Sequence, residues 1–318
     1  MSIRIISLFS GYDSPLIALD NLGIDYVLHA WSEIDPYAIK AHNILHPNQE
    51  EKNIGDIRQA TLTTNDIDLL FYSSPCQDFS KGGRNKGGAK GSNTRSSLLW
   101  EVERFVKKCN PTHLLMENVP TLATTHCKDL NAWINQLEKL GYYSQIYIIN
   151  ALETGTPQNR KRLFLHSTLG YPQILPLVFT EIRNWRDYLD KPPIPQKYYI
   201  DTVRIPKIKI KSQEQYPILL GFSRVYDHPN QSSYHSKQFF NTICTRNNIP
   251  PCNIIAENST TYRRLSTSER LRIMGLSETQ IQALISQINS TQLDKLAGNS
   301  IVISCLETIF KAIYLYNN

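Results

Sequence analysis

Cys76 has the sequence context of a nucleophile. It stands in Pro-Cys-Gln just past the apolar run 68–72, so it follows a strand-like segment instead of lying inside one. A thiolate is favoured where positive charge lies nearby. Residues 81–95 contain five lysines and arginines and no acid. The pattern therefore predicts a reactive thiol at position 76.

Two further positions have residue types suited to acid–base chemistry and to ligand binding. Glu117 follows the apolar run 113–116, where partial desolvation would suit a carboxyl for general-acid use. A structural acid that holds a turn would have the same pattern. Arg162 adjoins the strand-like run 163–166, and an arginine that points inward needs a carboxylate or a ligand oxygen as its partner.

Small and polar residues after the first two apolar runs suggest a nucleotide-like ligand. Phe9-Ser10-Gly11 leads into a predicted helix, whose N-terminus favours an anionic group. Glu33 follows the second run, where an acid commonly accepts hydrogen bonds from ribose hydroxyls. With Asp56 after Gly55, these residues outline an adenosine-type ligand. Taken singly, an ordinary turn and a solvated surface acid explain them as well.

Two basic segments are candidates for contact with a polyanion. Residues 81–95 also hold five of the fourteen glycines, which makes this segment a glycine-rich cationic loop. Residues 204–211 alternate basic with apolar side chains and predict a strand with one cationic face. A solvated connector and a solvated edge strand remain the alternatives.

The elements that must position these residues alternate along the first half of the chain. The periodicity predicts strands over residues 4–9, 26–31, 68–72, 113–116, 143–149 and 162–166, and helices over 14–22, 36–45, 98–109 and 130–140. Ser14 is the predicted N-cap of the first helix, with Pro15 at its first position. Strands separated by helices indicate βαβ crossovers and a mainly parallel sheet, which is an α/β fold.

The pattern changes near residue 170. From there to about residue 262 prolines cluster and the strands look short, which predicts a second, smaller, β-rich domain. Helical periodicity resumes at 266–274, and the segment from residue 292 places its apolar residues on one helical face. We predict three parts: a catalytic domain over 1–167, a small domain over 168–290, and a C-terminal helix over 291–318 that returns to the first domain.

Composition limits the class of protein. The chain has 318 residues, of which 41% are hydrophobic and 19% charged, and this excludes a disordered chain or a small disulfide scaffold. The net charge of +6 is compatible with a nucleic-acid partner. Six scattered cysteines, without metal-ligand spacing, argue against zinc and disulfides, and we expect the five other than Cys76 to be buried and structural. No apolar run predicts a membrane span, so we expect a cytoplasmic location.

The order of the motifs resembles that of the DNA cytosine-C5 methyltransferase family, over nearly the whole chain. The matching motifs are Leu8-Phe9-Ser10-Gly11, Glu33, Gly55-Asp56-Ile57, Ser74-Pro75-Cys76-Gln77, Ser97-Leu98, Glu117-Asn118-Val119, Gln158-x-Arg160-x-Arg162, Arg264-Leu265-Ser266 and Ala297-Gly298-Asn299-Ser300. One motif departs from the family pattern, because Asp13-Ser14 replaces the two later glycines of F-x-G-x-G-G.

The resemblance implies a Rossmann-like, S-adenosylmethionine-dependent methyltransferase fold with a β-rich target recognition domain. The implied catalytic residues are Cys76, Glu117, Arg160 and Arg162. The implied cofactor-binding residues are Phe9, Ser10, Gly11, Glu33, Ile34, Asp56, Ile57, Pro75, Leu98, Asn299 and Ser300. The implied DNA-binding residues are Gln77, Ser80, Lys81, Arg84, Lys86, Lys90, Arg95, Lys207, Lys209, Arg224 and Arg246. No metal is implied.

The family resemblance also implies a mechanism. The Cys76 thiolate would add to carbon 6 of a flipped-out cytosine in double-stranded DNA. Glu117 would hold or protonate ring nitrogen 3, and Arg162, with Arg160, would bind the carbonyl oxygen. S-adenosyl-L-methionine would give its methyl group to carbon 5 and leave as S-adenosyl-L-homocysteine.

Three alternatives to a DNA methyltransferase remain open. They are a transfer-RNA cytosine-C5 methyltransferase of the same architecture, a non-catalytic DNA-binding relative, and a cysteine hydrolase. Intact Cys76, Glu117 and Arg162 argue against the second, and the absence of a histidine in a comparable motif argues against the third. We expect a monomer that forms part of a restriction-modification system, with a possible cognate endonuclease. The target sequence cannot be inferred, because the recognition region varies within the family.

Overall fold

The computed structural model describes residues 2–62, 66–75, 87–88, 91, 95–201, 208–209, 215–223, 232–245 and 251–316. The chain divides into two compact units, and each is described by itself. The first unit consists of Met1–Ile149, Lys161–Val178 and Cys305–Asn318. The second unit consists of Asn150–Arg160 and Phe179–Ser304.

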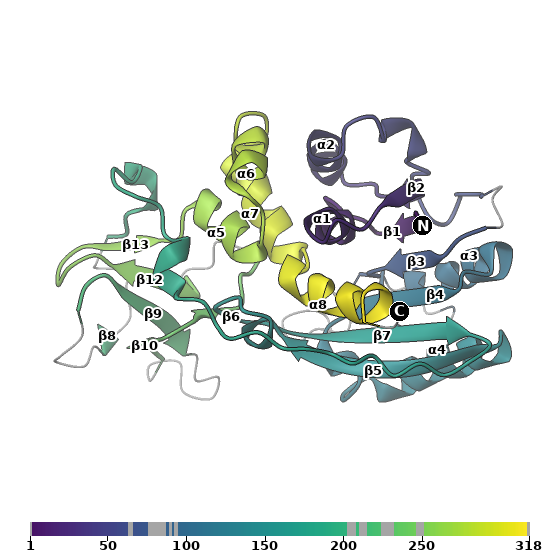
Figure 1. Ribbon diagram of the computed structural model, residues 1–318. Helices are drawn as coiled ribbons and strands as arrows, with labels where there is room; N and C mark the ends of the chain where they lie inside the picture. The colour runs from purple at the N-terminus through teal and green to yellow at the C-terminus, as the bar shows by residue number, and fades with distance from the viewer. Residues whose placement is uncertain are drawn as a thin grey trace. The chain divides into compact units, whose positions relative to one another are not determined.

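The first unit is built on a six-stranded sheet with the order β2-β1-β3-β4-β7-β5 (Figure 1). Its strands are β1 (Ile3–Leu8), β2 (Tyr26–Ser32), β3 (Leu69–Tyr72), β4 (His113–Asn118), β5 (Tyr142–Asn150) and β7 (Lys161–Leu169). The pairs β1–β2, β1–β3 and β3–β4 are parallel, whereas β7 runs antiparallel to β4. The predicted mainly parallel sheet is confirmed. The strand order reverses at β1 and β3, the position at which such folds bind ligands.

Helices cover both faces of this sheet. They are α1 (Ser14–Asn21), α2 (Pro36–Leu45), α3 (Val102–Cys109), α4 (Cys127–Lys139) and α8 (Ile303–Tyr314). Buried residues of α3 and α4 share one hydrophobic cluster with alternate strand residues, among them Leu70 and Leu114. Tyr314 of α8 contacts His113, whose side chain points to the opposite face from Leu114. Figure 1 shows α8 on the other side of the sheet from α3 and α4.

One predicted helix is shorter than expected. Of the predicted helix over 98–109, only Val102–Cys109 is an α-helix, and Arg95–Glu101 forms a 3₁₀-helix. Side chains of this first part bind other segments, since Ser96 Oγ donates to the carbonyl of Pro75 and Trp100 Nε1 to that of Gly88. We infer that these contacts favour the tighter winding.

The division into units differs from the predicted domain limits of 1–167, 168–290 and 291–318. Residues 150–160 and 291–304 belong to the second unit, and 168–178 belong to the first. The strand β6 (Gln158–Asn159) pairs with β11 (Phe240–Asn241), and α7 (Ser290–Asn299) packs on α5 (Thr267–Met274). These contacts join segments far apart in the chain, so no single cut in the sequence reproduces the division.

The second unit contains a five-stranded sheet with the order β13-β12-β9-β10-β8. Its strands are β8 (Ile208–Lys209), β9 (Ile218–Ser223), β10 (Ser233–Ser236), β12 (Asn253–Ala256) and β13 (Tyr262–Arg264). All pairs are antiparallel except β10–β8. The short, mostly antiparallel strands agree with the β-rich segment predicted over 168–262.

Helices complete the second unit. Capping boxes begin α5, through Ser266 and Glu269, and α6 (Glu278–Ile285), through Ser277 and Gln280. The predicted single C-terminal helix is wrong, because Ser300 has an extended backbone and ends α7 before α8 begins. The stretch Ser290–Tyr314 is apolar and long enough to cross a bilayer by composition, but 67% of its most apolar window is buried in the structure. Its hydrophobicity is that of core helices.

Three histidines of the first unit, His46 and His166 buried and His113 half-buried, have lowered pKa values. Burial lowers the pKa of His46 to about 4, of His113 to about 4 and of His166 to about 3. His46 faces Asp13 and His42, and the other two stack on each other near Asp68 and Tyr314. In the unfolded chain these histidines titrate near pH 6.5.

We expect the free energy of unfolding to fall as the pH drops from about 6.5 to 4. In this window the unfolded chain takes up protons that the native histidines do not, at a cost of up to about 1.4 kcal/mol per pH unit for each histidine. Urea denaturation between pH 7.5 and 4.5 measures the slope. His113→Gln should reduce the slope of unfolding free energy against pH. His29→Gln, at an exposed position, should leave this slope unchanged. A pH-independent unfolding midpoint would contradict the expectation.

Candidate active site

Strand register brings Ser73, Glu117 and Arg162 to one edge of the sheet. Tyr72 pairs with Met116 in parallel β3 and β4, so Ser73 comes beside Glu117. Asn118 pairs with Leu163, so the start of β7 reaches the same edge. Because β7 is antiparallel to β4, its first residues lie where β4 ends. β4 continues two residues beyond the predicted end, and Glu117 therefore lies within the strand.

Glu117 is buried and contacts a neighbour through each carboxylate oxygen. Oε1 lies 3.0 Å from Nε of Arg162, and Oε2 accepts a hydrogen bond of 2.6 Å from Oγ of Ser73. The Glu117 residue is only 6% exposed. Arg162 Nη1 donates to the carbonyl of Lys161, while no described residue accepts a hydrogen bond from Nη2. Arg162 thus has the carboxylate partner that an inward arginine requires and keeps donor capacity for a ligand.

Hydrogen bonds hold the segment after β3 at this edge. Asn118 Nδ2 donates to the carbonyl oxygen of Ser74 at 3.3 Å and to its Oγ at 3.4 Å. Ser96 Oγ donates to the carbonyl of Pro75 at 2.7 Å. The residue that follows Pro75 in the sequence is Cys76. The segment that leads into the predicted nucleophile is therefore anchored beside Glu117.

Many predicted residues lie outside the part of the chain that the structure describes. They are Cys76, Gln77, Ser80, Lys81, Arg84, Lys86, Lys90, Lys207, Arg224 and Arg246. The side chains of Arg95 and Lys209 are also outside it. The roles of these residues stay predictions.

Glu33 joins the turn after β1 to the turn after β2. Its Oε2 accepts the N–H of Gly11 at 3.0 Å, and its Oε1 accepts those of Ile34 and Asp35 at 2.7 and 2.9 Å. Gly11 has a φ of +60°, and no atom of the described chain lies within 4 Å of where a Cβ would be. The predicted residues Phe9, Ser10, Gly11 and Glu33 therefore meet at the carboxyl ends of two adjacent strands, with open space over the glycine.

Asn53 connects Glu33 to the segment that contains Asp56. Its Oδ1 accepts the N–H groups of Glu33 at 3.3 Å and of Gly55 at 2.9 Å. The Arg58 side chain donates to the Asp56 carboxylate and so lowers the pKa of Asp56. Asn53 was not predictable from the sequence, because an asparagine in a loop gives no signal until its partners are known.

The other predicted cofactor residues of the first unit differ in exposure. Ile34 is 65% exposed, which leaves its side chain free to cover a flat apolar ligand. Ile57 is buried in the hydrophobic cluster, which argues against direct contact of its side chain with a ligand. Leu98 is partly buried against the same cluster.

The predicted N-cap of the first helix is wrong. Asp13, not Ser14, is the N-cap of α1, with a left-handed φ of 62° and no capping hydrogen bond from its side chain. The Asp13 carboxylate instead turns inward, where Oδ1 accepts from Ser7 Oγ at 2.9 Å and Oδ2 lies 3.4 Å from Nε2 of His42. Asp13 stands where the family motif has a glycine, and its carboxylate ties this left-handed turn to β1 and α2.

Arg160 is fully buried in the second unit and holds backbone carbonyl groups. Its Nη1 donates to Ile243 O at 2.9 Å, and its Nη2 to Gly298 O at 2.9 Å and Ser300 O at 2.6 Å. This geometry gives Arg160 a structural task, unlike Arg162. The predicted catalytic role of Arg160 stays a prediction, and none of these contacts supports it.

We expect Arg160→Met to destabilise the protein by about 3 kcal/mol or more. The substitution removes three hydrogen bonds and leaves buried carbonyl groups without donors. Urea denaturation measures the loss, with Arg58→Met as a control at an arginine whose side chain is 62% exposed. Equal stability of the two variants would show that Arg160 is not the anchor that its contacts indicate.

The predicted motif around Asn299 and Ser300 packs closely against the backbone of residue 245. A Cβ on Gly298 would lie 2.3 Å from the N of Thr245, so only glycine fits there. Asn299 ends α7, and Ser300 gives its carbonyl to Arg160. Both residues belong to the second unit, and their contact with a cofactor stays a prediction.

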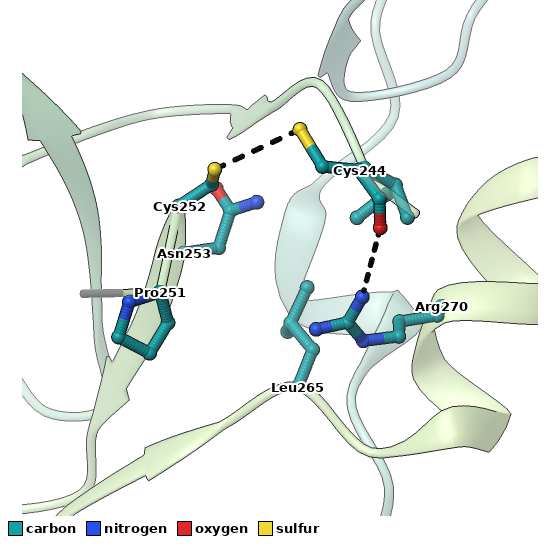
Figure 2. Close-up of a pocket in the computed structure, with 7 residues that line it drawn as sticks. Cys244, Pro251, Cys252, Asn253, Leu265 and Arg270 are labelled. Atoms are coloured by element: carbon teal, nitrogen blue, oxygen red, sulfur yellow. Dashed lines mark hydrogen bonds between the residues drawn. The ribbon is translucent and has the colours of Figure 1, made fainter. Parts of the chain in front are cut away.

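A small pocket in the second unit is lined by two cysteines. Figure 2 shows Cys244 and Cys252 among the residues that line it, together with Leu265 and Arg270. The two cysteine sulfurs lie 3.7 Å apart. Cys109 and Cys305 are buried, as expected of structural cysteines. The same expectation is wrong for Cys127, which is exposed because it begins α4 at the surface, and for Cys244 and Cys252, which are only partly buried.

A glycine turn, an acid and a buried carboxylate–guanidinium pair all lie at the carboxyl ends of strands β1 to β4, the edge at which α/β domains of this kind bind ligands. A profile of the family described as C-5 cytosine-specific DNA methylase matches residues 3–315. The chain belongs to this family, and it is a DNA (cytosine-5-)-methyltransferase by class.

Known relatives agree with this assignment. The chain is 32% identical over 277 residues to the type II methyltransferase M2.ScrFI of Lactococcus lactis subsp. cremoris, covering 84% of this chain and 72% of the relative. It is 32% identical over 291 residues to the orphan methyltransferase M.SssI of Spiroplasma monobiae, covering 86% and 72%. The crystal structure of the S. pombe Dnmt2 methyltransferase has the same fold, with a TM-score of 0.66, 18% identity and 97% coverage of both chains.

Proposed function

We propose that the chain methylates carbon 5 of a cytosine flipped out of a specific double-stranded DNA sequence, through a covalent adduct with Cys76. The observation that carries this proposal is the buried pair of Glu117 and Arg162, at the edge where the segment leading into Cys76 is anchored. A carboxyl and a guanidinium side by side match ring nitrogen 3 and the carbonyl oxygen at position 2, which are adjacent polar atoms of cytosine.

The proposal assigns each step to one residue. The Cys76 thiolate adds to carbon 6, and the displaced π electrons move through carbons 5 and 4 to nitrogen 3, which Glu117 protonates or holds. Arg162 binds the carbonyl oxygen with the donors that the structure leaves available. After carbon 5 is methylated, a base removes its proton, the Cys76 thiolate departs from carbon 6, and nitrogen 3 returns its proton to Glu117, which restores the ring. Flipping costs a few kcal/mol of stacking and pairing.

The ends of β1 and β2 fit an adenosine-type methyl donor. The open turn at Gly11, the carboxylate of Glu33 and the exposed Ile34 offer a helix N-terminus, a ribose acceptor and an apolar cover. When bound, S-adenosyl-L-methionine supplies the methyl group and leaves as S-adenosyl-L-homocysteine. In this assignment Asp56 and Leu98 line the same site.

The second unit is proposed as the target recognition domain. The predicted basic residues of its sheet and of the 81–95 loop would contact phosphates, which favours DNA over a small substrate. We propose that the protein is a cytoplasmic monomer that acts with a cognate endonuclease. The similarity to a type II methyltransferase supports the endonuclease partner.

Bisulfite sequencing of DNA from cells that express the chain tests the proposed function. We expect protected cytosines within one short sequence and none in cells expressing Cys76→Ser. Labelled methyl incorporation into duplex DNA and into transfer RNA, compared in parallel, separates the DNA enzyme from the RNA alternative. Labelling of transfer RNA alone would overturn the DNA assignment.

We expect Glu33→Ala to weaken cofactor binding at least about tenfold, because a ribose acceptor and the support of the Gly11 turn are both lost. Titration calorimetry with S-adenosyl-L-homocysteine measures the affinity. DNA affinity should stay within about twofold. Glu50→Ala removes an acid from a short surface helix and serves as the control. Unchanged cofactor affinity in Glu33→Ala would remove Glu33 from the site.

A further inference from the structure

Ser73 makes a contact that the proposed mechanism has not used. Its hydroxyl donates to Oε2 of Glu117 at 2.6 Å, the shorter of the two contacts to this carboxylate. We propose that Ser73 is a positioning residue, which holds the Glu117 carboxyl in the orientation that meets the cytosine ring. This inference rests on the proposed function of Glu117.

The backbone fixes Ser73 in this position. β3 and β4 are parallel with Tyr72 opposite Met116, so the next residues of the two strands, Ser73 and Glu117, point to the same side of the sheet. The N–H of Ser73 also donates to the carbonyl of Leu8, which ties it to β1 on its other side. Rigid neighbours on both sides leave the hydroxyl little freedom to move away from Glu117.

Two neighbouring strands hold the carboxylate from opposite sides. β4 lies between β3 and β7 in the sheet, so Ser73 approaches one oxygen and Arg162 the other. Contacts to both oxygens fix the plane of the carboxyl as well as its position. A general acid gains most when its reacting atom is oriented before the substrate arrives.

A hydroxyl suits this task better than a second cation would. It can donate to an ionised carboxylate and, after rotation, accept from a protonated one. Ser73 can therefore remain bound to Glu117 while Glu117 gives and regains a proton. Arg162 only donates, so it cannot accept the hydrogen bond that a protonated Glu117 offers.

The test compares Ser73→Ala with Ser73→Thr and a matched control. Ser144→Ala removes another hydroxyl hydrogen bond of the first unit, the 2.8 Å contact with Ser167. We expect Ser73→Ala to lower kcat of methyl transfer about tenfold with KM for DNA unchanged, and kcat must be measured below the thermal unfolding midpoint of the variant. Ser73→Thr keeps the hydroxyl and should recover most of the rate. Ser144→Ala should match the wild type.

A double-mutant cycle shows whether Ser73 acts through Glu117. In a Glu117→Gln background, Ser73→Ala should cost less than about twofold, because the group that it positions is already gone. A full tenfold loss in that background would overturn the role of Ser73 but not that of Glu117. Wild-type kcat in Ser73→Ala, with Glu117→Gln inactive, would do the same. Full activity of Glu117→Gln would overturn the proposed function of Glu117, and the role of Ser73 with it.

Discussion

Cys76→Ser is expected to reduce methyl transfer by at least about 10⁴-fold while DNA affinity stays within about threefold. A serine hydroxyl is far less acidic than a thiol and supplies almost no anion near neutral pH, so the covalent step loses its nucleophile. The side chains differ little in size, which leaves the DNA surface intact. Transfer of labelled methyl groups to duplex DNA measures the rate, and fluorescence anisotropy measures binding.

Cys127→Ser is the matched control for this variant. Cys127 is exposed at the start of α4, and its replacement should leave both activity and binding unchanged. Turnover close to that of the wild type in Cys76→Ser would remove Cys76 from the mechanism. Loss of activity in both variants would point to a general sensitivity of the fold to these replacements.

Glu117→Gln is expected to lower kcat by about 10²- to 10⁴-fold, the range of a lost general acid. Glutamine keeps the shape of the side chain and can still accept from Ser73, but it cannot protonate ring nitrogen 3. The substitution also leaves Arg162, whose side chain is 16% exposed, without its anionic partner. We therefore expect a lower thermal unfolding midpoint as well, and kcat must be measured below it.

Glu103→Gln is the control that separates the loss of the general acid from the loss of an ion pair. Glu103 pairs with Lys107 on α3, so its replacement removes an ion pair without touching the site. It should keep kcat at the wild-type value. A kcat for Glu117→Gln within about threefold of the wild type would show that Glu117 gives no proton to the base.

The central sheet was predictable because its information is local. Apolar runs of strand length, separated by helices with one apolar face, indicated β1 to β4 and their crossovers, and α2 occupies its predicted range. The reversed direction of β7 was not predictable, since the periodicity of apolar residues is the same for a parallel and an antiparallel strand. It decides the site, because only an antiparallel β7 brings Arg162 to the end of β4.

Motif spacing predicted the Glu117 and Arg162 assignments but not the contacts around them. Ser73 and Asn53 depend on register and on loop closure between distant segments, which one sequence does not encode in a readable pattern. Arg160 had the same sequence signal as Arg162, two positions away. The structure separates them, with Arg160 on the carbonyls of the second unit and Arg162 on Glu117. The division into units differs from the predicted domain limits for a similar reason, because β6 pairs with β11, a strand far along the chain.

The covalent adduct at residue 76 is the central claim, and trapping it is the most direct test. Duplex DNA with 5-fluorocytosine at the target position blocks loss of the group on carbon 5, so the enzyme cannot be released. With S-adenosyl-L-methionine present, we expect a stable protein–DNA complex whose tryptic digest carries the modified nucleotide on the Cys76 peptide. A methylated natural duplex with no trapped complex, or a trapped nucleotide on any other residue, would contradict it.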